Sequence, residues 1–533
     1  MITAMIETND RLLPVGIQSF EKIRKEGYLY VDKTDLVWNL ANRNKTYNYL
    51  SRPRRFGKSV LVDTLQAYFE GKKELFEGLK IMNFEKDWKR HAVIRLDMSR
   101  AGAEATTLRS YLNLAFTRYE EEYNVTPLEG ASLADRFDCI IQAAFQKTGQ
   151  QVVILVDEYD SPLQHSWKTP EHKACTDIYK AVFAILKADD IYERFVFITG
   201  ITKFTQISLF SVLNNLSNIS FDAAYAALCG ISKKEVAEYF MPELEEMSEK
   251  YQWSVEKTIE QLKDYYDGYH FSADNMVDVF NPFSLINALS DKKIRNYWAA
   301  SGANSLLPKF VTDMEIRLRD FDNCPIDSDT LETSDVSDGG AELFLYQSGY
   351  LTIKDYTEGV YLLGIPNNEV RKTLYKIVVP ALTLKSSALV ISTQNLLMYS
   401  MLSGNLCKAK DALKALIADV PYSNKKLASM DMEERYRLIL STIFNAIGFR
   451  VEVERMLSSG RIDMVVTNAN YIYVMELKLS KNGGIAAAEK QIKQNSYTAP
   501  FKADKRKVIA LAIELDNIGK GLIDWKEVKE QDN

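Results

Sequence analysis

The sequence predicts an α/β protein: an N-terminal parallel sheet with helices on both faces, a helical middle region, and a small C-terminal α/β domain. Three observations predict this class. Near-continuous apolar runs of strand length alternate with helix-like segments from Gly16 to about Phe221, which is typical of a parallel sheet covered on both faces. A mainly helical pattern follows from about Ala223 to Asn304. The C-terminal part again holds strands flanked by helices, so a second sheet is expected there.

The N-terminal part contains short apolar runs that we expect to be buried strands, at Thr46–Leu50, Ala92–Met98, Val152–Glu158 and Phe195–Gly200. Between them, apolar residues recur at helical spacing in Ser59–Phe69 and in Asp177–Ala188. Because apolar positions three and four residues apart fall on one side of a helix, we expect these two segments to be helices that cover the sheet.

The middle region begins with two amphipathic runs, Lys233–Phe240 and Ser254–Tyr266, which predict helices. The segment Phe321–Glu342 is acidic and rich in Asp, Ser, Thr and Gly. We therefore expect it to be a surface loop or an interdomain linker. The strand-like run Tyr350–Pro366 follows, and helical patterns continue to about Met430.

The C-terminal domain is expected to contain two helices, at Glu433–Ile447 and at Ile485–Ser496. Its expected strands are Phe449–Met456, Arg461–Thr467, Tyr471–Leu479 and Val508–Leu515. Taken together, the patterns divide the chain into four segments, 1–222, 223–320, 321–428 and 429–533.

Composition excludes several classes of protein. With 46% hydrophobic and 26% charged residues in a chain of 533, wholesale disorder and fibrous repeats do not fit. A net charge of −6 excludes a bulk polycation but leaves room for a local basic groove. The five cysteines form no close pair, which argues against a disulfide framework and a cysteine-rich zinc site. The start does not read as a signal peptide and no apolar run is long enough to span a bilayer, so we expect a reduced, soluble, cytoplasmic protein with no membrane partner.

A candidate phosphate-binding loop, SRPRRFGKS, occupies Ser51–Ser59 between a predicted strand and a predicted helix. It fits the Walker A pattern G-x-x-x-x-G-K-[ST] except that Arg52 replaces the first glycine. Gly57 would let backbone N–H groups approach phosphate oxygens, Lys58 would neutralise the β- and γ-phosphates of ATP, and the Ser59 hydroxyl would take Mg²⁺. The positive end of the following helix adds to the same site. The expected nucleotide-binding residues are Arg52, Pro53, Arg54, Arg55, Phe56, Gly57, Lys58, Ser59 and Asp157.

The apolar run that ends in Asp157 and Glu158 supplies the matching Walker B feature. Asp157 would hold the metal through water, and Glu158 would polarise the attacking water. The alternative is a basic turn after one buried strand and an exposed acidic pair after another. Because the first glycine of the loop is missing, we predict nucleotide binding and leave hydrolysis open.

Four further side chains near this loop have two interpretations each. Arg54 and Arg55 either add charge to the phosphate site or are solvated. Thr199 and Thr202 either sense the γ-phosphate from the neighbouring strand or are buried hydroxyls at the strand end.

The strings LPVGIQSFEKIRKEGYLYVDKT, RPRRFGKS, VDEYDSPL and ITGITKFTQISLFSVLNNLS resemble the AAA-ATPase-like domain of bacterial proteins of uncharacterised role. The resemblance covers about Leu13 to Phe221 and implies a P-loop NTPase fold. It carries over Lys58, Ser59 and Asp157 to the nucleotide site.

Two more segments share in this resemblance. Asp32 and Lys33 in YVDKT match a family-like block without an assigned role. The segment Asp264–Phe271, DYYDGYHF, is similar to the family's helical extension. Within it, we expect His270 to be a packed or capping residue and not a ligand.

A second candidate site combines Asp463 with Glu476 and Lys478. Side chains alternate along a strand, so Val474, Glu476 and Lys478 are expected on one face. Charges on an otherwise apolar sheet must pair or bind a cation. Two carboxylates plus a backbone carbonyl suit Mg²⁺ or Mn²⁺, with the lysine orienting a water or neutralising developing charge. The alternative is an inward salt bridge from the lysine to either acid, with no catalysis.

This arrangement resembles the PD-(D/E)XK nuclease superfamily over roughly Asp431 to Leu515, in the subgroup fused to AAA-ATPase-like domains. The resemblance implies Asp463, Glu476 and Lys478 as the catalytic set. Glu434 and Gln491 are the supporting candidates. The family's proline before the aspartate is replaced here by Ile462.

We therefore expect an ATP-binding protein with a Mg²⁺- or Mn²⁺-dependent nuclease domain that cleaves DNA under nucleotide control. RNA as the substrate and a homo-oligomeric assembly stay open. The alternative is a nucleotide-dependent signalling or assembly switch whose C-terminal domain binds DNA or protein without cutting.

Overall fold

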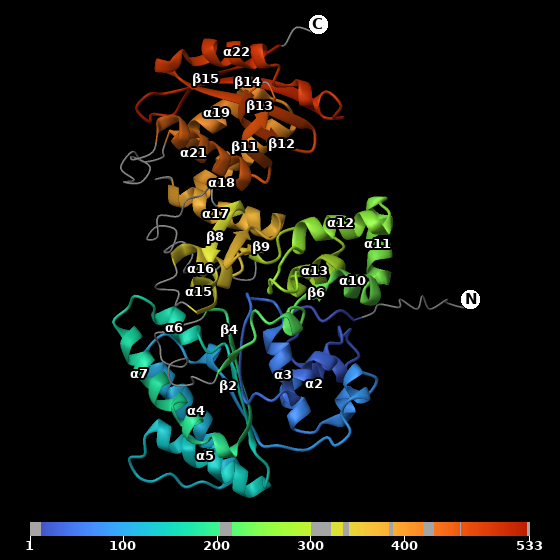
Figure 1. Cartoon of the computed structure of the whole chain (residues 1–533), viewed down its shortest axis with the longest axis vertical. Helices are drawn as coiled ribbons and strands as arrows, with labels where there is room; N and C mark the ends of the chain where they lie inside the picture. Colours follow the sequence, from blue (N-terminus) through green and yellow to red (C-terminus); the bar gives the residue numbers. More distant parts are fainter. Residues whose placement is uncertain are drawn as a thin grey trace, which may run out of the picture. The chain divides into compact units, whose positions relative to one another are not determined.

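The computed structural model describes residues 12–202, 216–299, 321–333, 340–382, 387–418, 431–458 and 460–529. The chain divides into two compact units (Figure 1). The first comprises Met1–Ser301 and Asn323–Asn367, and the second comprises Gly302–Asp322 and Asn368–Asn533. The division into four segments that the sequence suggests stays a prediction. No helix in the described ranges is both long and apolar enough to cross a membrane.

The first unit is built on a five-stranded parallel sheet of order β2-β3-β4-β1-β5. This confirms the predicted parallel sheet, whose strands are β1 Tyr47–Ser51, β2 Val93–Asp97, β3 Val152–Asp157, β4 Glu193–Gly200 and β5 Ser217–Asn218. All six residues of β3 are buried, as expected for a central strand with both faces covered. The short strand β5 was not predicted, because two residues carry no periodicity.

Helices cover both faces of this sheet, as the sequence predicts (Figure 1). On one face, side chains of α4, α5 and α7 join the strands in one apolar core that includes Phe116, Phe137 and Val182. On the other face, α3 packs onto the sheet through its buried residues. The ring centre of Phe69 in α3 lies 5.1 Å from the ring centre of Phe195 in β4. The α-helices of this part are α1 Phe20–Lys25, α2 Thr34–Asn42, α3 Lys58–Phe69, α4 Ala105–Tyr123, α5 Leu133–Thr148, α6 Ser161–Ser166, α7 Glu171–Phe183 and α8 Ile185–Ala188.

A helical extension follows the sheet, as expected, and forms its own core around Phe240, Leu262 and Leu285. Polar side chains begin three of its helices: Ser232 and Ser254 accept hydrogen bonds from first-turn amides, and Asn281 does the same for Ser284 N. The elements are β6 Ile231–Ser232, α10 Lys233–Tyr239, α11 Met241–Tyr251, α12 Val255–Tyr266, β7 Val279–Phe280 and α13 Pro282–Asp291.

The acidic segment Phe321–Glu342 differs from the prediction that it is a loop or linker. The described residues of this segment form β8 Cys324–Asp327, α15 Ser328–Thr333 and the beginning of α16 Gly340–Gln347. The strand β8 pairs with β10 Val360–Gly364, which pairs in turn with β9 Thr352–Thr357. In β8 only Cys324 and Ile326 face inward, so the alternation is too short to stand out against the acidic residues around it.

The second unit holds a five-stranded sheet of order β11-β12-β13-β14-β15, in which β13 and β14 are parallel and the other pairs antiparallel. The predicted strands appear as β11 Arg450–Leu457, β12 Gly460–Thr467, β13 Tyr471–Leu479 and β14 Lys507–Leu515. The fifth strand, β15 Leu522–Val528, was not predicted, because its buried residues Leu522, Trp525 and Val528 are spaced by three and do not alternate.

Helices surround this second sheet. The predicted helices correspond to α21 Met432–Ala446 and α22 Gly484–Asn495, and α22 packs through Ala488 and Ile492 onto Val474 and Ala510 of the sheet. The remaining helices are α17 Asn368–Leu382, α18 Ser387–Leu402 and α19 Leu406–Ile417. The helical pattern expected up to Met430 is confirmed as far as these ranges, and residues 419–430 lie outside the described part.

Candidate nucleotide site and candidate nuclease site

The predicted phosphate loop lies between β1 and α3 of the first unit. Gly57, at φ 88°, adopts the left-handed backbone that turns the loop into the helix. Lys58 is buried, and its Nζ donates to the carbonyl oxygens of Arg52 (2.9 Å) and Pro53 (3.1 Å). The ammonium group therefore lies within the arc of its own loop, where phosphate oxygens can replace weak carbonyl acceptors with charged ones.

Asp157 ends β3 beside this loop, as predicted. Burial raises the pKa of its carboxyl to about 6, although a hydrogen bond from Ser59 and the charge of Lys58 oppose the shift. Its Oδ1 is buried and has no hydrogen-bond partner in the described part of the chain. A hydroxyl and an unsatisfied carboxylate oxygen side by side fit Mg²⁺, which prefers oxygen ligands and keeps several waters. The neighbouring Glu158, at φ 50°, lines the cleft that opens in front of the phosphate loop.

A cleft of about 540 Å³ opens in front of the loop, within the size range of small-molecule sites. Its charged lining residues include Arg54, Arg55 and Lys58, and the guanidinium of Arg55 lies 4.8 Å from the ring centre of Phe283. Apolar walls come from the N-terminal segment, the segment before β6, and α13. Arg54 and Arg55 both line the cleft, and Arg55 is also exposed to solvent, so the two interpretations of these arginines stay open.

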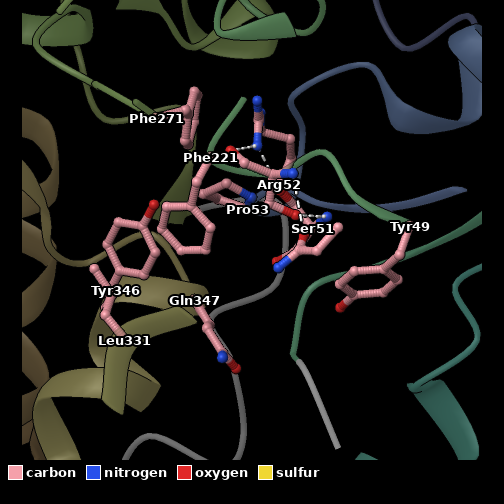
Figure 2. A pocket seen from close by; sticks show the side chains of 11 residues that line it. Tyr49, Ser51, Arg52, Pro53, Phe221, Phe271, Leu331, Tyr346 and Gln347 are labelled. Carbon is pink, nitrogen blue, oxygen red and sulfur yellow. Dashed lines mark hydrogen bonds between the residues drawn. The ribbon is translucent and has the colours of Figure 1, made fainter. Parts of the chain in front are cut away.

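Arg52 has a different place from the rest of the loop. Its side chain is 1% exposed and donates to the carbonyl oxygens of Ser51 (2.8 Å), Ser220 (2.8 Å) and Tyr225 (3.1 Å), while its guanidinium lies 4.0 Å from the ring centre of Phe271. Figure 2 shows the cavity beside it, lined by aromatic side chains. With a volume of about 20 Å³ this cavity has room for about one water. The side chain that replaces the Walker A glycine therefore braces the loop and does not line the cleft.

The apolar residues of the loop also serve as braces. Phe56 is buried and makes edge-to-face contacts with Tyr269 and Phe271 of the predicted extension motif, at 4.7 and 5.4 Å. Pro53 lies against Gly349, where a Cβ atom would come within 2.5 Å of the proline side chain.

Thr199 in β4 and Thr202 just after it are both buried and hydrogen-bonded. Thr199 Oγ1 donates to Leu50 O at 2.8 Å, which fits the buried-hydroxyl interpretation. Thr202 donates through its N (2.6 Å) and its Oγ1 (2.7 Å) to the carboxylate of Asp160. Sequence reasoning missed Asp160, although it follows the Asp-Glu pair by only two residues, and Gly200 has no room for a side chain beside it.

The family-like block around Asp32 has a structural role. Asp32 accepts from Thr34 N (2.9 Å), Thr34 Oγ1 (2.7 Å) and Lys80 N (2.7 Å), so it ties the start of α2 to a distant turn. Lys33 forms a largely buried ion pair with Glu235 at 2.7 Å. This contact joins the segment before α2 to the helix α10 of the extension.

His270 of the extension motif is a packed residue, as expected. Its Nδ1 contacts Ile353 O at 2.9 Å and its Nε2 contacts Asp278 at 2.7 Å. The imidazole of His270, together with Lys263, holds the pKa of the Asp278 carboxyl well below its usual range.

In the second unit, the structure brings Asp463 of β12 together with Glu476 and Lys478 of β13. The Oδ2 of Asp463 accepts from Leu477 N at 2.9 Å, which fixes it against the neighbouring strand. Lys478 Nζ lies 2.7 Å from Glu476 Oε1 and 3.8 Å from Asp463 Oδ2. The salt bridge of the alternative interpretation is therefore present. It leaves Glu476 Oε2 buried without a partner in the described ranges, so the ion pair alone does not satisfy this carboxylate.

The electrostatics of this cluster are those of a crowded acidic site. Burial and the charge of Asp463 raise the pKa of Glu476 to about 7, with Lys478 opposing the shift. Burial lowers the pKa of Lys478, but the surrounding carboxylates outweigh burial and the net shift is upward. Perturbed groups of opposite charge in contact are typical of functional sites.

Two supporting residues were predicted for this site. Gln491 of α22 donates to Tyr497 Oη at 3.1 Å, and Tyr497 donates to Arg461 O at 2.7 Å, so Gln491 supports the start of β12. Glu433 of α21 interacts with the cluster: burial and the charge of Asp463 raise the pKa of its carboxyl, and the charge of Lys478 opposes the shift. The role of the adjacent Glu434 stays a prediction.

The cluster offers a divalent ion two carboxylates, those of Asp463 and Glu476. Among the residues that the structure describes, no group of three or more His, Cys, Asp or Glu side chains is arranged to hold an ion. Asp463 and Glu476 provide two carboxylates, and Mg²⁺ is commonly bound by one or two carboxylates with water and substrate phosphate completing its shell. With the unsatisfied Oε2 of Glu476, the residues fit a hydrated divalent ion shared with substrate.

The folds and sites described above define a P-loop NTPase domain followed by a nuclease-type sheet domain. Comparison with known families agrees: residues 14–210 match the family described as "Predicted AAA-ATPase", and residues 431–525 match the PD-(D/E)XK nuclease superfamily. A protein of Azotobacter chroococcum mcd 1, described as an uncharacterized protein in the vnfD 5' region, is 30% identical over 523 residues, which are 96% of this chain and 98% of the relative. The chain belongs to this family of AAA-ATPase-like proteins with a C-terminal PD-(D/E)XK domain.

Among solved structures, the chain was matched to the Aeropyrum pernix ORC1 protein in complex with DNA. The match has 10% identity and a TM-score of 0.23, and it covers 64% of this chain and 92% of that one. At this score the similarity carries no argument about fold or function.

Proposed function

We propose that this protein binds ATP with Mg²⁺ in its first unit and hydrolyses DNA phosphodiester bonds at a divalent-metal site in its second, with nucleotide controlling cleavage. The observation that carries the nuclease half is the convergence of Asp463, Glu476 and Lys478 around one unsatisfied carboxylate oxygen. Membership in the two families supports the same combination of activities.

At the nuclease site the chain's own groups have distinct tasks. Leu477 N–H holds Asp463 in place, so its second oxygen is available for an ion. Lys478 neutralises Glu476 in the metal-free state and is close enough to both acids to hold a water or a phosphate oxygen once an ion takes those carboxylates. A bound Mg²⁺ or Mn²⁺ supplies a water of lowered pKa and neutralises charge on the reacting phosphate.

At the nucleotide site, Lys58 exchanges its two loop carbonyls for the β- and γ-phosphates, and the backbone N–H groups at the start of α3 face the same anion. Ser59 and Asp157 would hold Mg²⁺. Glu158 lines the cleft and is the candidate base for hydrolysis.

A plasmid assay tests the nuclease half. Supercoiled DNA is incubated with Mn²⁺ or Mg²⁺, with and without ATP, and with wild type, Glu476→Ala or Lys478→Ala protein. We expect nicking by wild type and a loss of at least about 100-fold in each variant, the usual cost of removing a group that stabilises transition-state charge. Equal nicking by all three proteins contradicts the assignment of the site. No nicking by wild type, combined with an ATP-dependent change in mass by light scattering, favours the non-cutting switch.

A further inference from the structure

Arg437 of α21 is a charged residue at the nuclease cluster that no motif singled out. Its side chain is 11% exposed, and its Nη2 lies 3.9 Å from Asp463 Oδ1 and 4.0 Å from Glu433 Oε1. Both distances exceed a hydrogen bond. Its Nε is buried and has no partner in the described ranges. The guanidinium of Arg437 therefore lies near Asp463 and Glu433 but donates no hydrogen bond to either of them.

Glu454 holds this arginine from the other side. Its Oε1 pairs with Arg437 Nη1 and lies 3.2 Å from Nη1 of Arg461. The register of β11 with β12 pairs Val453 with Met464 and Arg455 with Ile462, so Glu454 lies opposite Asp463. The pairing between β11 and β12 skips Glu454, and the backbone of Glu454 has φ 54°. A left-handed glutamate inside a strand is strained, and such strain is concentrated at functional sites.

The charges around the cluster indicate what Arg437 meets. Four acids, Glu433, Glu454, Asp463 and Glu476, oppose three cations, Arg437, Arg461 and Lys478, which leaves one net negative charge. A bound divalent ion would turn this into one net positive charge, complementary to the single negative charge of a phosphodiester. Arginine presents a planar fork of donors that matches two phosphate oxygens, and unsatisfied donors beside Asp463 are placed for that role.

We propose that Arg437 is a further catalytic residue of the nuclease site, which binds the non-bridging oxygens of the scissile phosphodiester, and that Glu454 is the positioning residue that orients it. This assignment rests on the proposed nuclease function. In the reaction, a water loses a proton as its oxygen bonds to phosphorus, the bond from phosphorus to the leaving oxygen breaks, and the leaving oxygen takes up a proton. The products are a phosphomonoester and an alcohol. Arg437 stabilises the negative charge that gathers on the phosphate oxygens in between.

The test compares Arg437→Ala, Arg437→Lys and Glu454→Gln with wild type on a DNA duplex, measuring kcat, KM and Mn²⁺ affinity by calorimetry. We expect kcat to fall by about 100-fold or more in Arg437→Ala and by about 10-fold in Arg437→Lys, since a lysine lacks the fork. Mn²⁺ affinity should stay within about threefold of wild type. Glu454→Gln should lower kcat less than Arg437→Ala, and the double variant should be no worse than Arg437→Ala alone, because both changes act through one contact.

The control is Arg450→Ala, another arginine of this unit, whose side chain is 78% exposed and pairs with Glu452 at the far end of β11. It should cleave as wild type does. If Arg437→Ala keeps the wild-type kcat, the assignment of Arg437 is wrong while the proposed nuclease function stands. The same holds if Arg437→Ala loses Mn²⁺ affinity in parallel with kcat, because Arg437 would then only support the metal ligands. A wild-type protein that binds Mn²⁺ but cleaves no DNA overturns the proposed nuclease function itself, and the assignment falls with it.

Discussion

Lys58 is a buried cation that donates to two carbonyl oxygens of its own loop. Neutral acceptors are weaker partners for an ammonium group than phosphate oxygens, so nucleotide binding gains from the exchange. Lys58→Ala should lower ATP affinity about 10-fold to 100-fold, the range for hydrogen bonds to charged groups. Titration of a fluorescent ATP analogue measures this. The matched control is Lys257→Ala, at a side chain that is 52% exposed on α12; equal affinity in the two variants would remove Lys58 from the site.

Glu476 has a raised pKa of about 7 because it is buried beside Asp463. A metal ion needs the ionised carboxylate, so Mn²⁺ affinity should rise about 10-fold per pH unit below 7 and level off above it. Binding at pH 6 should then release close to one proton and binding at pH 8 much less. Calorimetry in two buffers of different ionisation enthalpy counts these protons.

The same pKa shift has a consequence for stability. A carboxyl whose pKa is higher in the folded than in the unfolded state stabilises the fold at low pH, and this contribution is lost as the pH rises through the folded-state pKa. For Glu476 the loss falls between about pH 4.5 and 7. Glu476→Gln should abolish both the proton release and this part of the pH dependence. Proton release that persists in Glu476→Gln would assign it to another group.

At the level of elements, the phosphate loop is enclosed by neighbours from distant parts of the same unit. Gly349, at φ 86°, leaves no room for a Cβ atom beside Pro53. Gly349→Ala therefore adds an overpacking cost of about 1–3 kcal/mol to the cost of a left-handed alanine, about 1–2 kcal/mol. We expect lower stability to urea and weaker ATP binding, because the displaced residue belongs to the loop.

Gly359 offers a matched control for this prediction. It has nearly the same backbone, φ 85°, but a Cβ atom there would come no closer than 4.0 Å to Ser328 Oγ. Gly359→Ala should show the backbone cost alone and bind ATP as wild type does. If both variants lose equal stability and neither loses ATP affinity, the contact between Gly349 and Pro53 does not shape the loop.

Elements with strong local patterns were predictable, and contacts between distant elements were not. The runs that became β1 to β4 and β11 to β14 have dense apolar residues, so their class was clear from the sequence. By contrast, β8 and β15 contain few inward residues and were missed. Glu433, Arg437 and Glu454 reach the nuclease cluster through the rotation of α21 and a backbone irregularity in β11. Neither feature leaves a periodic signal. The commitment of Arg52 to distant carbonyls is invisible for the same reason.

For the whole molecule, the proposal requires that ATP in the first unit changes cleavage by the second. Such coupling is a free energy between two sites, commonly about 1–3 kcal/mol, which corresponds to about 5-fold to 150-fold in affinity. We expect saturating ATP to change the DNA affinity of a non-cleaving Glu476→Gln protein by a factor in this range. By linkage, DNA should change the ATP affinity of this protein by the same factor.

Fluorescence anisotropy with labelled DNA and with labelled nucleotide measures the two factors independently. Adding Lys58→Ala should remove both effects while DNA binding without ATP stays unchanged. If ATP leaves the DNA affinity unchanged and DNA leaves the ATP affinity unchanged, the two units act independently. If the response to ATP survives Lys58→Ala, the nucleotide acts at another site.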